Sequence, residues 1–212
     1  MSIADLRKEY KLTALRRKDL DADPIRQFQT WLQAALDAGL VEPNAMTLAT
    51  ADTTGKPSAR TVLLRGLDER GFSFFTNYES RKGRELSENP NAALVFYWAE
   101  LERQVCIAGS TSRLAAVESE AYFRSRPRGS RLAAWASRQS EVISSRAEIE
   151  ERVRELEKLY PDDSVPLPSY WGGFVLSPVR IEFWQGRPNR LHDRFCYTRQ
   201  AGHTWTIERL SP

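Results

Sequence analysis

Residues 182–199 read EFWQGRPNRLHDRFCYTR, a stretch that predicts one of the last strands of a sheet and sets arginines and a histidine next to aromatic side chains. If its second half is extended, the side-chain period of two directs Arg190, His192 and Arg194 to one face. A surface strand can carry such a row without any function. Beside Trp184, the same row can also hold an anionic, planar ligand. The rest of the sequence must decide between these two interpretations.

The composition is that of an ordinary soluble globular protein. Of 212 residues, 41% are hydrophobic and 28% are charged, which allows a full core and excludes a disordered or collagen-like chain. No apolar run approaches the ~20 residues of a membrane helix, and the first residues lack the apolar segment of a signal peptide. We therefore expect a cytoplasmic protein with no membrane partner. Cys106 and Cys196 have no neighbouring His or Cys at metal-ligand spacing, so neither a disulfide nor a bound metal is expected.

The net charge of +3 is consistent with an anionic partner. The cations are spread among 28 acidic residues, however, and no helix-turn-helix, zinc-finger or RNP-like motif accompanies them. We therefore expect no nucleic-acid partner. A small phosphorylated ligand needs only a few well-placed arginines.

The order of predicted elements indicates an α+β fold built on an antiparallel, Greek-key-like barrel. Residues 1–20 form a basic arm with too few apolar residues to fold alone, so we expect a mobile arm followed by one domain over residues 21–212. The first helix is predicted over residues 21–40, with Asp23 as its N-cap and Gly39 at its end. Strands are predicted at 45–52, 57–66, 71–77, 92–99, 103–114, 174–186, 190–199 and 204–210, and further helices at 80–89, 116–125 and 144–160.

No glycine-rich phosphate motif of the Rossmann or P-loop type is present. Side chains must therefore bind any phosphate, and arginine and lysine do so through charge-assisted hydrogen bonds. Taken singly, each candidate group also fits an ordinary solvated surface. The groups are Arg60 with Arg65, then Thr76 with Arg81 and Lys82, then Tyr122 with Arg126 and Ser130, and finally Arg190 with His192 and Arg194.

Polar residues at the ends of apolar strands are more specific evidence for a ligand. Arg60 and Arg65 bracket an apolar run and Gln104 precedes another, and buried guanidinium and amide groups need partners. A flavin ring system, with its carbonyl oxygens and ring nitrogens, would satisfy both. Further donors and an aromatic wall are expected from Gln139, Ser140 and Trp184. A hydrolase is poorly supported, because there are two histidines and no G-x-S-x-G motif.

The sequence as a whole closely resembles the pyridoxamine/pyridoxine 5'-phosphate oxidase family. The matching segments run through nearly the whole chain and include RTVLLR, FFTNYESRKGREL, YFRSRPRGS, QSEVISSR and VPLPSYWGGF, and the ending IEFWQG with RLHDRF is very specific. The resemblance implies an FMN-binding split β-barrel whose homodimer holds FMN in two clefts at the subunit interface. It also implies oxidation of pyridoxamine 5'-phosphate and pyridoxine 5'-phosphate to pyridoxal 5'-phosphate. Hydride would pass to the flavin. O2 would then reoxidise the reduced flavin and would itself be reduced to hydrogen peroxide.

The resemblance also implies a role for individual residues. Arg190 and His192 would face the pyridine ring of the substrate as the catalytic pair. Arg65, Tyr122, Arg126 and Ser130 would hold its 5'-phosphate, and Arg7 and Tyr10 would belong to an N-terminal lid over it. The FMN-binding set would be Arg60, Thr61, Val62, Leu63, Leu64, Arg65, Phe75, Thr76, Arg81, Lys82, Gln104, Gln139, Ser140, Trp184 and Arg194.

Three alternative functions are weighed against this one. Another split-barrel flavin or deazaflavin reductase would share the barrel but should lack RLHDRF and YFRSRPRGS. A non-catalytic carrier or sensor of FMN or pyridoxal phosphate would not need the full set of substrate residues. A nucleic-acid binder ranks last.

Overall fold

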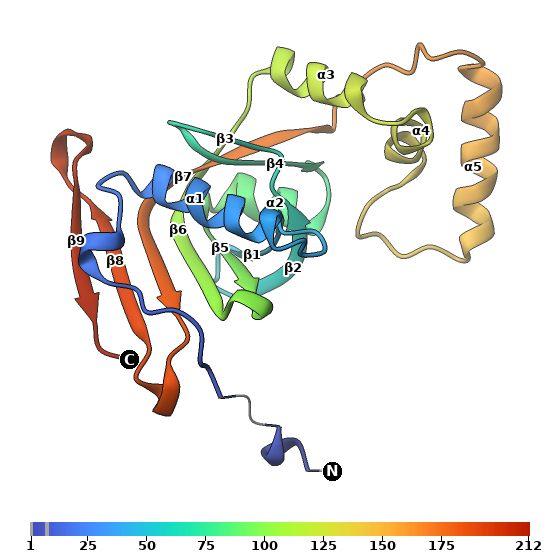
Figure 1. The fold of residues 1–212 in the computed structure, drawn as a ribbon. Helices are drawn as coiled ribbons and strands as arrows, with labels where there is room; N and C mark the ends of the chain where they lie inside the picture. Colours follow the sequence, from blue (N-terminus) through green and yellow to red (C-terminus); the bar gives the residue numbers. More distant parts are fainter. Residues whose placement is uncertain (1, 7–8) are drawn as a thin grey trace.

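The computed structural model describes residues 2–6 and 9–212. Within them, nine strands form one antiparallel sheet that curls into a half-barrel, with helices at its mouth and at one side (Figure 1). The predicted α+β class and antiparallel barrel are confirmed. The strands are β1 Ala45–Ala51, β2 Pro57–Leu63, β3 Gly66–Asp68, β4 Gly71–Asn77, β5 Asn91–Trp98, β6 Arg103–Arg113, β7 Trp171–Gln185, β8 Asp193–Arg199 and β9 Trp205–Leu210. The helices are α1 Pro24–Asp37, α2 Arg81–Glu88, α3 Ala116–Ser125, α4 Arg128–Ala136 and α5 Arg146–Leu159.

The long strand β7 organises the sheet. Along one side it pairs with β6, with a shift of register between Ala108 and Gly109. On its other side, its first half pairs with β4 and its second half pairs with β8. The strand order is β2-β1-β5-β6-β7-β4-β3, with β8 and β9 attached to the second half of β7. The sheet therefore divides at β7 into a barrel part and a C-terminal extension made of β8 and β9.

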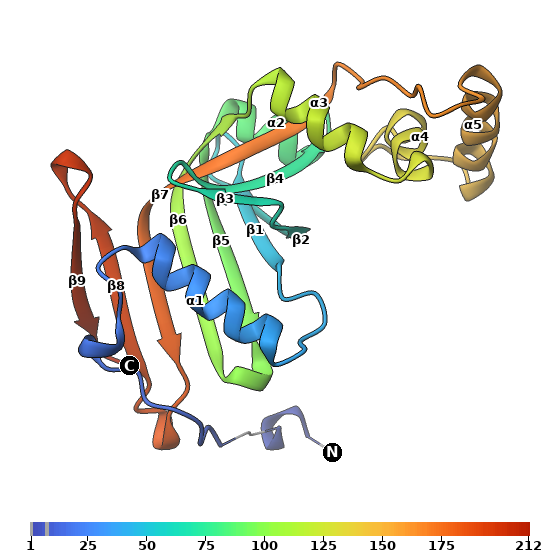
Figure 2. The same ribbon diagram turned by 45° about the horizontal axis from the view of Figure 1, so that its top comes forward.

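Helix α1 fills the mouth of the barrel. The Asp23 carboxylate accepts a hydrogen bond from the Ile25 N–H at 2.9 Å, which caps the helix as predicted. Phe28 and Trp31, on the inner face of α1, are buried in the main core. The Phe28 ring meets Phe72 of β4 edge-on, with 4.9 Å between the ring centroids. Figure 2 shows α1 lying across the concave face of β5 and β6.

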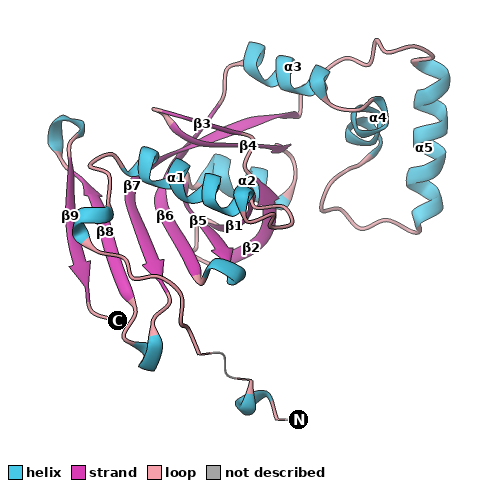
Figure 3. Ribbon diagram, viewed as in Figure 1, coloured by secondary structure: helices cyan, strands magenta, loops and turns pink. Residues whose placement is uncertain are grey.

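Helices α3, α4 and α5 form a separate group beyond one end of the sheet (Figure 3). They enclose a second, smaller core around Phe123, Leu132, Val165 and Trp171. Helix α4 was not predicted, because its sequence RGSRLAAWA begins with residues typical of a turn. The short strand β3 was also not predicted, and β2 ends at Leu63 instead of continuing to residue 66.

The predicted strand RLHDRFCYTR is wrong at its beginning. A short 3₁₀ turn ends at Arg190, and β8 begins only at Asp193. The backbone φ angles of Asn189 and Arg190 are 55° and 60°, which an extended strand does not accept. Arg190, His192 and Arg194 therefore do not share a face through strand alternation.

The second half of the N-terminal arm lies against the sheet. Leu15 is buried in the main core, and its N–H donates a hydrogen bond to Asp193 Oδ2 at 3.1 Å. The Tyr10 ring contacts Trp184 and His192. Among the described residues, none of the helices combines the length and the hydropathy that crossing a membrane requires.

Candidate ligand-binding cleft

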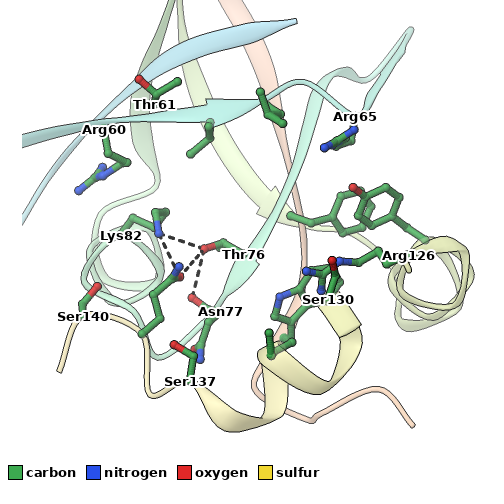
Figure 4. A pocket seen from close by; sticks show the side chains of 18 of the residues that line it. Arg60, Thr61, Arg65, Thr76, Asn77, Lys82, Arg126, Ser130, Ser137 and Ser140 are labelled. Atoms are coloured by element: carbon green, nitrogen blue, oxygen red, sulfur yellow. Dashed lines mark hydrogen bonds between the residues drawn. The ribbon is translucent and has the colours of Figure 1, made fainter. Parts of the chain in front are cut away.

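A cleft of about 990 Å³ lies between the outer edge of the barrel and the helices α3 and α4. Figure 4 shows Arg60 and Lys82 at one side of this cleft and Arg65 and Arg126 at the other. The chain segments that line it are distant in sequence and meet only through the fold. Of the residues singled out from the sequence, the cleft brings together Arg60, Thr61, Val62, Leu63, Arg65, Phe75, Thr76, Arg81, Lys82, Tyr122, Arg126, Ser130, Gln139 and Ser140.

The buried carboxylate of Glu85 on α2 orients the cations at the first end. Glu85 Oε1 accepts from Arg81 Nε at 2.8 Å, and Oε2 accepts from Ser58 Oγ at 2.6 Å. Oε2 also lies 3.3 Å from the Arg60 guanidinium and accepts from Thr50. Desolvation opposes the charge of Glu85, but these hydrogen bonds outweigh it and lower its pKa to about 2. Both arginines are therefore held in place by a fully ionised partner.

Lys82 is the second cation at this end. Its ammonium lies 3.2 Å from Thr76 Oγ1 and 3.1 Å from Gln139 Oε1, so strand β4 and the loop after α4 converge on it (Figure 4). Desolvation, and then the charge of Arg60, lower the pKa of Lys82 to about 8. A bound anion would therefore stabilise the charged form of Lys82 more than it would stabilise that of a solvated lysine. The cations gathered at this end of the cleft suit an anionic group such as a phosphate.

The other end of the cleft has an aromatic wall. Phe75 stacks on Tyr122 with 3.9 Å between the ring centroids, and Trp171 lies behind Phe75, nearly parallel to it, at 5.7 Å. The Arg126 guanidinium lies 4.6 Å from the centre of the Trp171 ring, and Arg65 lies 5.9 Å from that of Tyr122. Cation–π contacts with these rings therefore help to hold the two guanidinium groups in place.

Arg126 carries an unpaired hydrogen-bond donor. Its Nη1 atom is buried and has no hydrogen-bond partner within the described part of the chain. Desolvation, together with the charges of Arg65 and Arg131, lowers the pKa of Arg126. A buried, unpaired guanidinium N–H is costly, and a bound anion would remove that cost. The second end of the cleft thus also fits a phosphate group.

A second cluster of predicted residues lies on the sheet, outside the cleft. Gln104, Trp184 and Arg194 are direct cross-strand neighbours on β6, β7 and β8. The His192 ring lies 4.6 Å from Trp184, centroid to centroid. His192 Nδ1 accepts a hydrogen bond from the Arg187 N–H at 3.1 Å, so the neutral ring carries its proton on Nε2.

The arginines of this cluster differ in their surroundings. Arg194 Nε donates to Glu182 Oε1 at 2.8 Å, and its Nη1 donates to the Ser211 carbonyl oxygen at 2.8 Å. Arg190 is exposed in the turn before β8. Desolvation, followed by the charges of Arg190 and Arg194, lowers the pKa of His192. This histidine is therefore predominantly neutral near pH 7.

Within one chain, the two clusters lie on different parts of the curled sheet. Thr61 on β2 and Trp184 on β7 are four strand positions apart in the order β2-β1-β5-β6-β7. At ~4.8 Å per strand this corresponds to roughly 19 Å along the sheet. Of the other predicted residues, Leu64 is buried in the main core, Tyr10 belongs to the second cluster, and Arg7 lies outside the described residues.

Some residues around the cleft were missed in the sequence. Glu85 could have been found from its i,i+4 spacing to Arg81 on a predicted helix, a typical ion-pair distance. Trp171 is the first residue of β7 and directly follows a proline-rich stretch that reads as a loop, and no sequence signal connects it to Phe75. The cleft-lining residues that were not predicted are Ser58, Ala59, Asn77, Ser125, Pro127, Ala133, Ala134, Ser137 and Trp171.

Comparisons with known proteins agree with this picture. Residues 32–160 match the family described as pyridoxamine 5'-phosphate oxidase, and residues 171–212 match the pyridoxine 5'-phosphate oxidase C-terminal dimerisation region. Two proteins named pyridoxine/pyridoxamine 5'-phosphate oxidase, from Cyanothece sp. and Paraburkholderia phytofirmans, are 59% and 60% identical to this chain. Both alignments cover 100% of this chain and 99% of the relative.

Two solved structures extend the comparison. PhzG from Burkholderia lata 383, in complex with tetrahydrophenazine-1-carboxylic acid, has a TM-score of 0.89 and 32% identity, and the match covers 97% of this chain and 100% of that one. A pyridoxamine 5'-phosphate oxidase-related, FMN binding protein from Nostoc punctiforme has a TM-score of 0.72 at 22% identity, covering 91% and 100%, and shares the fold.

Together, the fold and the cleft define a split-barrel protein with a two-ended cationic cleft. Within this class, the length and identity of the matches are decisive. The chain belongs to the pyridoxamine 5'-phosphate oxidase family.

Proposed function

We propose that this chain is an FMN-dependent oxidase that converts pyridoxamine 5'-phosphate and pyridoxine 5'-phosphate to pyridoxal 5'-phosphate. The observation that carries the proposal is the cleft with two separate cationic ends, since the reaction brings together two phosphorylated molecules. The full-length relatives named pyridoxine/pyridoxamine 5'-phosphate oxidase support the same reaction. Dioxygen is the second substrate.

The first end of the cleft fits the phosphate of FMN. Arg60 and Arg81 are already oriented by Glu85, and Lys82 projects between Thr76 and Gln139. These groups supply several charge-assisted donors for one phosphate. When bound, FMN supplies the hydride acceptor and passes the electrons on to dioxygen. The residues Thr61, Val62, Leu63 and Ser140 would line its path along the cleft.

The second end fits the phosphate of the substrate. Arg65 and Arg126 would each pair with it, and Tyr122 and Ser130 add hydroxyl donors on the same wall. The buried Nη1 of Arg126 would then gain its missing acceptor. The protein's contribution here is to bind one end of the substrate tightly and so to fix the position of its ring.

The cluster on the sheet would complete the site of a neighbouring subunit. Within one chain, Trp184 lies roughly 19 Å along the sheet from the cleft residue Thr61. A second copy can bring its own Gln104, Trp184 and Arg194 to the flavin. Its Arg190, His192 and Tyr10 would close over the substrate ring. Residues 171–212 match the dimerisation region of the family, which supports a homodimer.

A carrier or sensor would need the phosphate sites but not a second set of residues around the ring. His192, neutral near pH 7 and carrying its proton on Nε2, can donate one hydrogen bond to the substrate. This favours catalysis over storage.

The proposal is tested by reconstituting the purified protein with FMN and adding pyridoxamine 5'-phosphate in air. Pyridoxal 5'-phosphate and hydrogen peroxide should appear in equal amounts. Unphosphorylated pyridoxamine is the matched control and should react far more slowly, because it cannot use Arg65 and Arg126. A protein that cannot take up FMN, or that binds it but releases no aldehyde, would contradict the proposal.

The shared cleft is tested separately by light scattering on the flavin-loaded protein. We expect a dimer with one FMN per chain. A flavin-saturated and fully active monomer would refute the contribution of a second subunit.

A further inference from the structure

At residues 11 and 12, the N-terminal arm is attached to the sheet by backbone hydrogen bonds to one buried carboxylate, that of Glu102. Glu102 Oε2 accepts hydrogen bonds from the N–H groups of both Lys11 and Leu12, at 2.9 and 3.0 Å. Glu102 is only 3% exposed, although the arm residues that it contacts are exposed. Two donors on one buried carboxylate oxygen form a strong, charge-assisted attachment. Both donors are backbone N–H groups of the arm.

Glu102 is itself fixed by the end of β7. It stands in a left-handed conformation, with φ of 54°. Its carbonyl oxygen accepts from the Gly186 N–H at 2.7 Å and from Gln185 Nε2 at 3.1 Å. The backbone of this turn is therefore held in place, and the Glu102 side chain projects toward the arm from a rigid support.

The residue directly before the attachment is Tyr10. Its ring lies over Gly186, where an added Cβ would come within 2.7 Å of the Tyr10 ring. The same ring meets Trp184 and His192 edge-on, with centroid distances of 5.5 and 5.6 Å. The absence of a side chain at position 186 thus creates the space that Tyr10 occupies.

From these contacts we infer that Glu102 is a positioning residue for the substrate site: it fixes residues 10–12 so that Tyr10 covers His192 and Trp184. This inference rests on the proposed function, in which His192 faces the substrate ring. Glu102 touches neither ligand and acts only through Tyr10. It should therefore affect how well the substrate is retained and leave FMN binding unchanged.

A second attachment holds the arm at Leu15, so Glu102 is needed only for the few residues before it. Asp193 Oδ2 accepts from the Leu15 N–H at 3.1 Å, and Asp193 Oδ1 accepts from Arg209 at 2.7 Å. Leu15 is also buried in the main core. Loss of the Glu102 contact should therefore release residues 10–12 while the arm stays docked from Leu15 onward.

The test is hydrogen exchange of the full-length, FMN-loaded protein, combined with steady-state kinetics. In Glu102→Ala, the amides of Lys11 and Leu12 should exchange about tenfold to 100-fold faster, as expected when each amide loses one hydrogen bond to a charged group. Glu102→Gln keeps one acceptor and should be intermediate. Glu100→Ala, an exposed residue of the same turn, is the matched control and should exchange as the wild type does. The Leu15 amide should stay protected in all three variants.

In the kinetic assay, the KM of Glu102→Ala for pyridoxamine 5'-phosphate should rise about tenfold, with a smaller change in kcat and unchanged FMN content. Wild-type exchange rates at Lys11 and Leu12 in Glu102→Ala would overturn the inference. If Glu102→Ala does not fold, Gly186→Ala replaces it: the added Cβ should displace Tyr10 and raise KM, and a wild-type KM would overturn the inference. A wild-type protein that shows no oxidase activity would refute the proposed function instead, since the exchange experiment is read without turnover.

Discussion

Replacing Glu85 with glutamine should destabilise the folded chain by a predictable amount. The pKa of Glu85 lies at about 2 in the folded chain, against an ordinary value of 4.5. A difference of roughly 2.5 pH units, at 1.36 kcal/mol each, corresponds to about 3 kcal/mol of unfolding free energy at pH 7. Glutamine has nearly the same volume, so the change leaves no cavity. It removes the charge that Arg60 and Arg81 require.

The pH dependence of the unfolding free energy shows whether the charge of Glu85 is responsible for the effect. Because the folded-state pKa is depressed, ionised Glu85 stabilises the folded chain above pH 4.5, and this stabilisation is lost as the pH falls toward 2. The difference in unfolding free energy between wild type and Glu85→Gln should therefore narrow by about 2 kcal/mol between pH 7 and pH 3.

The assay is urea unfolding of the FMN-free proteins at equal concentration, at both pH values. Glu88→Gln, at the exposed end of the same helix, is the control and should match the wild type. At pH 7, Glu85→Gln should also bind FMN more weakly, because Arg60 and Arg81, which we propose to bind its phosphate, lose their ion-pair partner. A difference in stability that is the same at pH 7 and pH 3 would refute the electrostatic role of Glu85.

Three further predictions concern the arginine and lysine side chains that we propose bind the ligands. Arg126→Met should raise KM for pyridoxamine 5'-phosphate by about tenfold to 100-fold with FMN affinity nearly unchanged, whereas Arg124→Met on the exposed side of α3 should behave as the wild type; equal effects of the two would contradict the assignment. The dissociation constant of FMN should rise by up to about tenfold per pH unit above pH 8 as Lys82 loses its proton, and Lys82→Gln should abolish this dependence in a fluorescence titration. Arg194→Met should release FMN, whereas Arg190→Met should keep it and reduce it about 100-fold more slowly in stopped-flow measurements; normal reduction by Arg190→Met would remove Arg190 from the site.

Local signals in the sequence were sufficient for most of the barrel. The predicted strand at residues 71–77 is found unchanged as β4, because apolar residues and turn residues at both ends define it. Asp23 and Gly39 bound the first helix as expected, since capping depends on the nearest few residues. Helix α4 was missed because its first residues, Arg128 to Ser130, resemble a turn, and the packing of its later residues Leu132 and Trp135 in the second core depends on the tertiary structure.

The candidate site was predictable in its members but not in its arrangement. Strand alternation suggested that Arg190, His192 and Arg194 share a face. The positive φ angles of Asn189 and Arg190 interrupt the extended chain, however, so β8 begins only at Asp193. A conformation of this kind is set by the surrounding turn and leaves no periodic signal. The separation into a cleft and a sheet cluster depends on strand order, which a single sequence does not reveal. The roles of the individual residues stay predictions.

The most direct test of the central claim is the reduction of bound FMN by its substrate without oxygen. The FMN-loaded protein is mixed anaerobically with pyridoxamine 5'-phosphate, and the visible absorption of the flavin is followed. We predict complete loss of the oxidised flavin band with one pyridoxal 5'-phosphate formed per FMN, and full return of the band when air is admitted. A flavin that stays oxidised in the presence of saturating pyridoxamine 5'-phosphate and pyridoxine 5'-phosphate would contradict the account.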